Sequence, residues 1–275
     1  MPDATRTIWS RDSIASTACV IQGERLLTNH ITVDDTLLVI VRQGQKSIDW
    51  HGHSILLSAG DAVLVGSGCA FDVTNIPPSS TAPFEAEWLS FPSLKLSDTG
   101  GKKDSLMPRA LRDVTPFFLQ AFCHTVAAIR DATHIPETVA RKRMEEMSEW
   151  LVSFGLVLMP VEKEMLSQRI RRLVVTDLPR NWTASEVARH FAMSEATFRR
   201  RLSTEHTSFR YLVTEARMGH ALTLLQVTDQ TISQIASGVG YENPSKFSAR
   251  FRARFGFNPG KIRVQETVCD PVSLV

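Results

Sequence analysis

Basic and small polar side chains gather on two short segments near the end of this 275-residue chain, and such side chains suit contact with nucleic acid. The segments are TASEVARHFAMSEATFRRRL, from Thr183 to Leu202, and TISQIASGVGYENPSKFSARFRARF, from Thr231 to Phe255. The apolar spacing of each predicts a short helix, a turn and a second helix with a basic face. The chain is therefore predicted to contain two helix-turn-helix units.

In the first unit, the second helix is predicted to begin after Ser194, a residue type that caps helix N-termini well. Phe198 and Leu202 then fall on one side of the helix at the spacing of a buried face. The opposite arc is predicted to contact base edges in DNA, through Ala196, Arg199 and Arg200.

In the second unit, Gly240 is predicted to end the first helix in a left-handed conformation, and Pro244 is predicted to begin the next one. Phe247, Phe251 and Phe255 recur at every fourth residue and predict a buried row. The remaining arc supplies three predicted base contacts: Ser245, Lys246 and Ala249.

Residue chemistry assigns roles to these side chains. Arginine and lysine donate to guanine edges, serine pairs with either base type, and alanine touches only a thymine methyl group. Further basic residues are predicted to contact phosphates, which position the protein without specifying a sequence: Arg217, Arg250, Arg252, Arg254 and Lys261. The alternative is that such arginine-rich faces are merely solvated, and the duplication argues against it.

Charge distribution supports nucleic-acid contact at one end of the chain. The formal net charge of the whole chain is only +2. Residues 163–263 hold 17 Lys and Arg against 8 Asp and Glu, a charge of +9, whereas the remainder holds 14 against 21, a charge of −7. A basic C-terminal domain attached to an acidic remainder fits phosphate contact by that domain alone.

Three stretches of the region from Val161 to Arg263 resemble the AraC/XylS family of bacterial transcription regulators. They are WTASEVARHFAMSEATFRRRL, SFRYLVTEARMGHALTLLQ and ISQIASGVGYENPSKFSARFRARFGFNPGKIR, in the order and spacing of that family. The stretch EHTSFRYLVTEARMGHALTLL looks most like the virulence and acid-resistance regulators of enteric bacteria and vibrios. The resemblance implies an activator with an N-terminal effector domain. Two departures, Gly219 in the linking helix and Gly260 after the Asn258-Pro259 turn, affect no predicted reading residue.

The rest of the chain predicts an α+β architecture. Residues 14–91 show short strands, including the apolar run Leu37–Val41, with a hairpin turn at Trp50–His53. This spacing predicts a jelly-roll or cupin-like N-terminal domain, which the family resemblance also implies. The predicted domains are a sensing domain (1–105), a helical linker or dimerisation segment (106–160) and an all-α double helix-turn-helix domain (161–265).

Just before the predicted helical linker, the polar stretch Leu96–Ser105 is expected to be a linker or an exposed loop. Two helices are predicted after it, over residues 115–132 and 136–154, because apolar residues recur at helical spacing. The family resemblance implies that such helices form a homodimer, and the alternative is that they pack on the barrel.

No metal or other cofactor is predicted. The pattern Gly60-x5-Gly66-x-Gly68-x2-Phe71 echoes metal-binding cupins, but Phe71 stands where those proteins keep a histidine. Only His51 and His53 remain as candidate ligands, and a catalytic metal usually needs three. The four cysteines have no metal-binding spacing and are expected to be free thiols. With no signal peptide or membrane span evident, a cytoplasmic location is expected.

The sequence thus predicts a DNA-binding transcription regulator and not an enzyme. Promoter DNA and RNA polymerase are the expected partners. Arg42 and Lys46 are candidate contacts for a carboxylate effector such as a fatty acid, as the resemblance to fatty-acid-responsive regulators implies. A protein partner in place of the effector, a metal cupin enzyme fused to a DNA-binding module, and an architectural DNA-binding protein without sequence preference are the alternatives.

Overall fold

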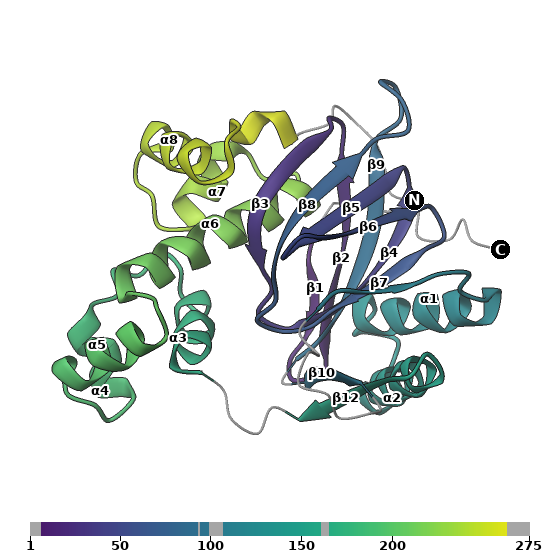
Figure 1. Cartoon of the computed structure of the whole chain (residues 1–275), viewed down its shortest axis with the longest axis horizontal. Helices are drawn as coiled ribbons and strands as arrows, with labels where there is room; N and C mark the ends of the chain where they lie inside the picture. The colour runs from purple at the N-terminus through teal and green to yellow at the C-terminus, as the bar shows by residue number, and fades with distance from the viewer. Residues whose placement is uncertain (1–6, 93, 99–106, 161–164, 263–275) are drawn as a thin grey trace. The chain divides into compact units, whose positions relative to one another are not determined.

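The chain divides into two compact units in the computed structural model, which describes residues 7–92, 94–98, 107–160 and 165–262. The first unit comprises residues 1–161 with 226–229 and 261–275, and the second comprises residues 162–225 and 230–260. The first unit contains the β-sheets and the second is helical. The predicted α+β class is confirmed (Figure 1).

Two antiparallel sheets form the body of the first unit. In sheet order, the six-stranded sheet consists of β1 (Trp9–Arg11), β2 (Ala15–Gln22), β9 (Phe84–Phe91), β4 (Thr36–Gln43), β7 (Ala62–Val65) and β11 (Arg109–Leu111). The four-stranded sheet consists of β3 (Leu26–Thr32), β8 (Ala70–Ile76), β5 (Gln45–Trp50) and β6 (His53–Ser58).

The six-stranded sheet is covered on both faces, which explains why β4 reads as an uninterrupted apolar run. Leu38 and Ile40 pack in one core, with the helices that follow the sheet in sequence. Val39 and Val41 pack in a second core, between the two sheets. Because successive side chains of a strand point to opposite faces, both sets of positions must be apolar.

The hairpin predicted at Trp50–His53 is confirmed as the turn between β5 and β6. Its two central residues, His51 and Gly52, have φ values of 45° and 80°. Positive φ at both positions is the conformation that suits the twist of a two-residue hairpin.

Helices α1 (Pro116–Arg130) and α2 (Glu137–Ser153) match the two predicted helices closely. The Thr115 hydroxyl caps α1 by accepting from the Phe118 N–H. Both helices share one apolar core with the six-stranded sheet, through residues such as Phe122 and Met147. They therefore belong to the first unit and pack on its six-stranded sheet, which was the predicted alternative to a role in dimerisation.

One loop prediction is wrong in part. The stretch predicted as an exposed loop begins within β10 (Leu94–Asp98), which pairs with β12 (Leu156–Pro160). Leu96 is 2% exposed, because it joins the core under α1 and α2. The polar composition concealed this one strand, and residues 99–106 lie outside the described part.

The cysteine prediction is wrong for Cys19, which is disulfide-bonded. Cys69 and Cys123 are free thiols, as predicted, and Cys269 lies outside the described residues. Burial raises the pKa of the Cys69 thiol to about 11. Formation of a disulfide depends on the fold, so spacing along the chain did not reveal it.

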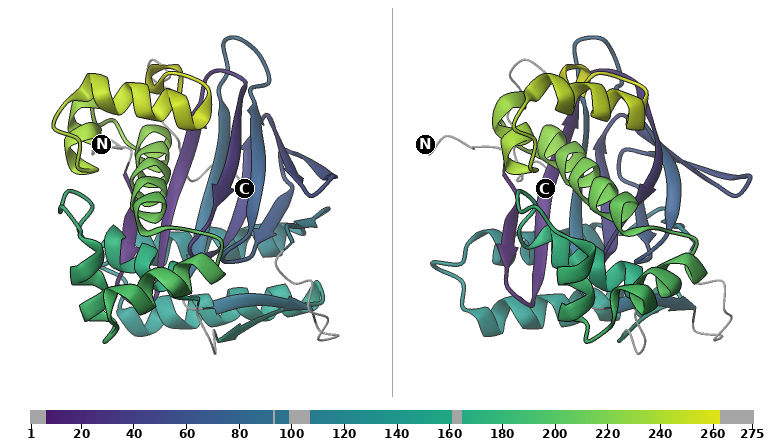
Figure 2. Two further views of the ribbon diagram at one scale, coloured as in Figure 1. Left: turned by 60° about the vertical axis from the view of Figure 1, so that its left-hand side comes forward. Right: turned by 90° about the vertical axis from the view of Figure 1, so that its left-hand side faces the viewer.

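The second unit consists of helices, and α6 extends from the pair α4–α5 to the pair α7–α8 (Figure 2). Their bounds are α3 (Leu166–Val175), α4 (Ala184–His190), α5 (Glu195–Thr204), α6 (Phe209–Val227), α7 (Ile232–Gly238) and α8 (Pro244–Phe255). Helix α6 continues unbroken through Gly219. Among the described residues, no helix is both long and apolar enough to cross a membrane.

Candidate nucleic-acid interface

Helix α5 has the cap and the buried face that the sequence predicts. The Ser194 hydroxyl accepts a hydrogen bond from the Thr197 N–H at 3.2 Å, which satisfies one of the free amides of the first turn. Phe198 and Leu202 are 0% and 1% exposed. The opposite arc, which includes Ala196 and Arg200, is exposed.

Helix α8 is anchored in the same way. Asn243 caps it by accepting from the N–H groups of Ser245 at 2.8 Å and Lys246 at 3.2 Å, with Pro244 at the first helical position. The predicted phenylalanine row is buried, and its ring centroids lie 5.8 Å and 4.6 Å apart along Phe247, Phe251 and Phe255. Ser245, Lys246 and Ala249 are exposed on the other side.

The two helix-turn-helix units share one backbone device and differ in length. In the first, Met193 donates to the Ala188 carbonyl at 2.9 Å across Ala192, whose φ is 53°. In the second, Tyr241 donates to the Ala236 carbonyl at 2.8 Å across Gly240, whose φ is 83°. The following cap comes two residues after Ala192 but three after Gly240. The two units are therefore related but not interchangeable.

Gly240 is required where it stands. A Cβ added there would lie 2.8 Å from the Arg217 guanidinium and 2.9 Å from the Leu178 carbonyl oxygen. The Arg217 Nε donates to that carbonyl at 3.1 Å, and a terminal nitrogen donates to the Arg180 carbonyl at 3.0 Å. Arg217 thus links α6 to the segment before α4, a role that the sequence did not reveal.

Some of the predicted DNA contacts already form ion pairs or hydrogen bonds within the protein, and others do not. Arg199 pairs with Glu195 at 2.5 Å on the same helix, and Arg254 pairs with Glu215 at 2.7 Å with both side chains largely buried. Of the predicted DNA contacts, four exposed cations have neither an ion pair nor a side-chain hydrogen bond within the described residues: Arg200, Lys246, Arg250 and Arg252. The phosphate contacts predicted for Arg217 and Arg254 have no support in this geometry. Lys261 lies in a short 3-10 helix (Pro259–Ile262), and its predicted contact remains a prediction.

Helix α3 is held to the rest of the helical unit by an acidic residue, Glu205, which caps its N-terminus. Both carboxylate oxygens of Glu205, the residue after α5, accept hydrogen bonds, from the Leu166 N–H at 2.9 Å and the Ser167 N–H at 2.8 Å. A carboxylate at a helix N-terminus also interacts favourably with the helix dipole. This contact was not predictable from the sequence, because the partners lie 39 and 38 residues apart.

In the unit that contains the β-sheets, the two predicted effector contacts, Arg42 and Lys46, lie apart. Arg42 lies on the helix-covered face of the six-stranded sheet, where it donates to Glu87 Oε2 at 2.7 Å, and Arg130 donates to Glu87 Oε1 at 2.5 Å. Glu87 is 2% exposed. Although burial alone would lower it, the charge of Glu87 raises the pKa of Arg42. The carboxylate that Arg42 meets is therefore one from the protein itself.

Lys46 instead points between the two sheets. Its Nζ donates to Asn75 Oδ1 at 2.6 Å and lies 5.2 Å from the centroid of the Phe84 ring. Asn75, 2% exposed, donates in turn to Gln22 Oε1 at 3.1 Å. Burial lowers the pKa of Lys46 to about 7, and among the described residues no carboxylate pairs with it. This buried amine is the candidate cation for an anionic ligand.

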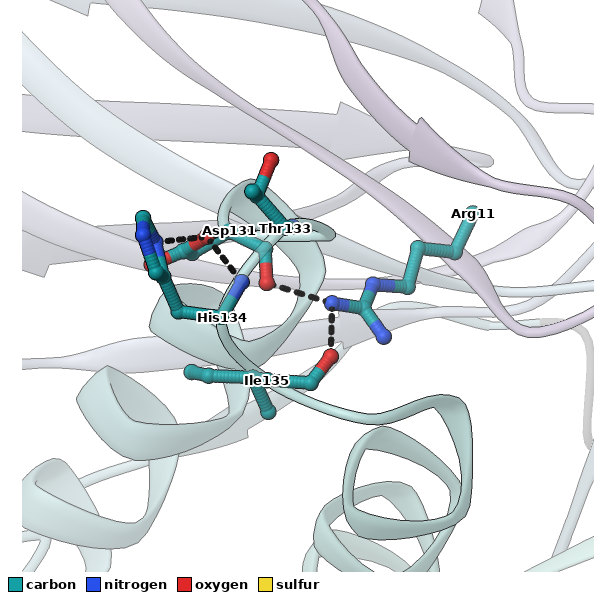
Figure 3. A network of polar contacts seen from close by, with 5 residues as sticks. All are labelled: Arg11, Asp131, Thr133, His134 and Ile135. Atoms are coloured by element: carbon teal, nitrogen blue, oxygen red, sulfur yellow. Dashed lines mark hydrogen bonds and ion pairs between the residues drawn. The ribbon is translucent and has the colours of Figure 1, made fainter.

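Arg11 joins the N-terminal edge strand to the connection between α1 and α2 (Figure 3). It donates to the carbonyl oxygens of Asp131 at 2.5 Å and Ile135 at 2.7 Å, near the C-terminal end of α1. The Asp131 carboxylate accepts from the Thr133 and His134 N–H groups, and the His134 bond is the main cause that lowers the pKa of Asp131. The network fixes the course of this connection.

Comparison with protein families finds a match to a helix-turn-helix domain over residues 187–265. The transcriptional regulator SirC of Salmonella typhimurium is 36% identical over 92 residues, which are 34% of this chain and 31% of SirC. The DNA-binding dual transcriptional regulator Rns of Escherichia coli is 37% identical over 93 residues, which are 34% of this chain and 35% of Rns. The chain therefore matches only about a third of the length of each of these relatives.

Solved structures extend the likeness of fold to almost the whole chain. Wild-type ToxT from Vibrio cholerae, solved bound to unsaturated fatty acid, has a TM-score of 0.61 and is 14% identical, covering 93% of this chain and 94% of that one. A ligand-free variant of ToxT from the same organism has a TM-score of 0.63 and is also 14% identical, covering 92% and 97%. At this identity the likeness shows the fold alone. The family match and the relatives SirC and Rns show that the C-terminal domain of this chain, with its two helix-turn-helix units, is a DNA-binding domain of the AraC type.

Proposed function

We propose that this protein binds double-stranded promoter DNA sequence-specifically and regulates transcription. The observation that carries the proposal is the pair of capped helices, α5 and α8, each seated on buried phenylalanine and each presenting exposed cations. Among the described residues, Arg200 and Lys246 have no partner within the protein. Unpaired cations on a rigid helix are available to donate to guanine edges in the major groove.

Successive major grooves on one face of DNA lie about 34 Å apart. Helix α6 has 19 residues and connects the two units, so at 1.5 Å per residue it extends about 28 Å. A connection of this length supports simultaneous entry of α5 and α8 into neighbouring grooves. Ala196 and Ala249 would meet thymine methyl groups, Ser245 would pair with either base type, and Arg252 would contact a phosphate.

Replacing Arg200 with alanine is expected to weaken binding to the preferred duplex by about 1 to 3 kcal/mol and to relax base preference at one position. The duplex is the one that the wild-type protein selects from a random library, and binding is measured by titration and footprinting. Arg112→Ala removes an equal charge from an exposed position of the first unit and should change neither property. An equal loss of affinity for selected and random DNA would show that Arg200 contacts a phosphate instead.

We also propose that the protein activates transcription in the cytoplasm by contacting RNA polymerase at the promoter. Support comes from relatives whose names describe them as transcriptional activators, such as FapR of Escherichia coli. A homodimer through α2 is proposed because the family resemblance implies it and Val139 is 41% exposed on that helix. Sedimentation of the protein with and without DNA would test the dimer.

For the first unit, we propose a carboxylate effector that pairs with Lys46. The amine is buried, has no counter-charge among the described residues, and lies beside the apolar core between the sheets. A buried ammonium gains from an anion because an unpaired charge is costly in an apolar environment. ToxT, which shares the fold, has been solved bound to unsaturated fatty acid, and this supports a ligand of that class.

Calorimetry with oleate and with butanoate is the test of this effector. Lys46→Met should weaken carboxylate binding by at least about tenfold, because the ammonium supplies a charged hydrogen bond of about 1.5 to 3 kcal/mol. Lys142→Met, at an exposed position on α2, is the matched control and should bind as wild type does. If neither carboxylate binds to wild type, a protein partner becomes the better account of this unit.

The lowered pKa of Lys46 predicts how the stability of the protein depends on pH. Its pKa is about 7 when folded and 10.5 ordinarily, so between these values the unfolded chain holds a proton that the folded chain lacks. The free energy of unfolding should therefore rise as pH increases through this window. Lys46→Met should be more stable than wild type by about 1 to 3 kcal/mol at pH 6. Urea unfolding at several pH values should show this difference shrinking towards pH 10.

A further inference from the structure

A pocket of about 370 Å³ lies between the first half of α6 and the second half of α8. Ser208, Arg210 and Tyr211 line it from α6 and the residue before it, and Arg250 and Arg254 line it from α8. All of these residues belong to the second unit. The pocket is thus part of the helical domain and is formed by the helix that connects the two helix-turn-helix units.

The pocket carries an excess of positive charge. Glu215, which also lines it, is committed to Arg254, whose Nε donates to both carboxylate oxygens at 2.7 Å and 2.8 Å. This ion pair holds α6 against α8. Arg210 and Arg250 are exposed and have no ion pair or hydrogen bond from their guanidinium groups within the described chain. Two arginines without a counter-charge and Tyr211 therefore line the same space, which suits an anion with several acceptor oxygens.

The order of elements determines which anion would reach this pocket. Ser208 follows α5 by only four residues, and Arg250 follows Ala249 on α8 directly, at the flank of the predicted reading arc. When two helices on one side of DNA enter successive major grooves, the backbones between them border the intervening minor groove. In such a complex, an element that connects the two helices lies beside those backbones, and α6 is that element in this chain.

We propose that the pocket formed by α6 and α8 binds backbone phosphates beside the minor groove that separates the two reading helices. The inference rests on the proposed DNA-binding function and assigns Arg210, Arg250 and Tyr211 to contacts that the reading arcs do not make. Such contacts carry no base code, but the distance between the two backbones depends on groove width. Base pairs that no side chain touches would therefore influence affinity.

The test uses the full chain and the duplex that wild type selects from a random library. Arg210→Ala/Arg250→Ala should reduce the slope of log K against log salt by about 2, because each neutralised phosphate contributes about 0.9. Base preference should stay the same. Arg25→Ala/Arg112→Ala removes the same charge from exposed positions of the first unit and should leave the slope unchanged.

Neutral methylphosphonates placed between the two protected major-groove segments provide a second measurement. They should weaken wild-type binding and have little further effect on the double variant, because the contacts that they remove are already lost. An unchanged salt slope, or equal sensitivity of both proteins to the methylphosphonates, overturns the assignment. So does a double variant that binds DNA normally but loses activation, since the pocket would then serve a protein. A wild-type protein that protects no specific sequence overturns the proposed function itself.

Discussion

The Glu87→Ala variant is expected to lose about 3 to 5 kcal/mol of unfolding free energy, because two guanidinium groups share this one buried carboxylate. Arg42 reaches it from β4 and Arg130 from the last turn of α1. Arg130 also lies 4.3 Å from the centroid of the Trp9 ring, and its Nε is buried without a hydrogen bond. Removing the carboxylate leaves two largely buried positive charges side by side.

Urea unfolding followed by tryptophan fluorescence would measure this loss. Glu85→Ala, on the same strand, is the matched control: burial raises the pKa of Glu85, and among the described residues no cation pairs with it. We expect the control to change stability by less than about 1 kcal/mol. Equal effects of the two substitutions would mean that the shared ion pairs contribute nothing specific.

The Phe251→Ala variant is expected to lose about 3 to 5 kcal/mol of unfolding free energy, because the substitution leaves a cavity beneath α8. We expect the variant to lose its DNA-binding activity as well. Phe251 is fully buried, and its ring contacts those of Phe247, Phe255 and Phe257, with centroids 5.8, 4.6 and 5.9 Å away. Without this support, α8 loses the surface that fixes its orientation.

Thermal unfolding and DNA titration on the same preparation would measure both effects. Phe117→Ala provides the comparison, because that ring is 71% exposed on α1 and should contribute less than about 0.5 kcal/mol. Normal DNA affinity with a lowered melting temperature would show that α8 keeps its position without the phenylalanine row.

Local signals in the sequence predicted the helical domain well. Helix caps and left-handed turns involve neighbouring residues, so they can be predicted from the sequence. Examples are the caps at Ser194 and Asn243 and the left-handed Gly240. The same holds for the β5–β6 hairpin. In contrast, Ala192 occupies a left-handed conformation that its residue type does not announce.

Contacts between distant segments were not predictable. Arg42 and Glu87 are 45 residues apart, and Arg217 meets a carbonyl 39 residues away. The sequence does not show whether a charged side chain on a strand or helix is solvated, forms an ion pair, or shares a counter-ion with another residue. Arg42 therefore read as a candidate effector contact, and Arg217 and Arg254 read as phosphate contacts, although the fold engages all three internally.

The unequal turns of the two helix-turn-helix units have a consequence for promoter architecture. A symmetric dimer that uses one recognition helix twice reads a palindrome, which is the same in both orientations. Under the proposed function, one copy of this chain reads two different half-sites with α5 and α8, so its DNA site has a polarity. Inverting the site would turn the N-terminal unit to face the opposite end of the promoter, and regulation would depend on the orientation of the site as well as its sequence.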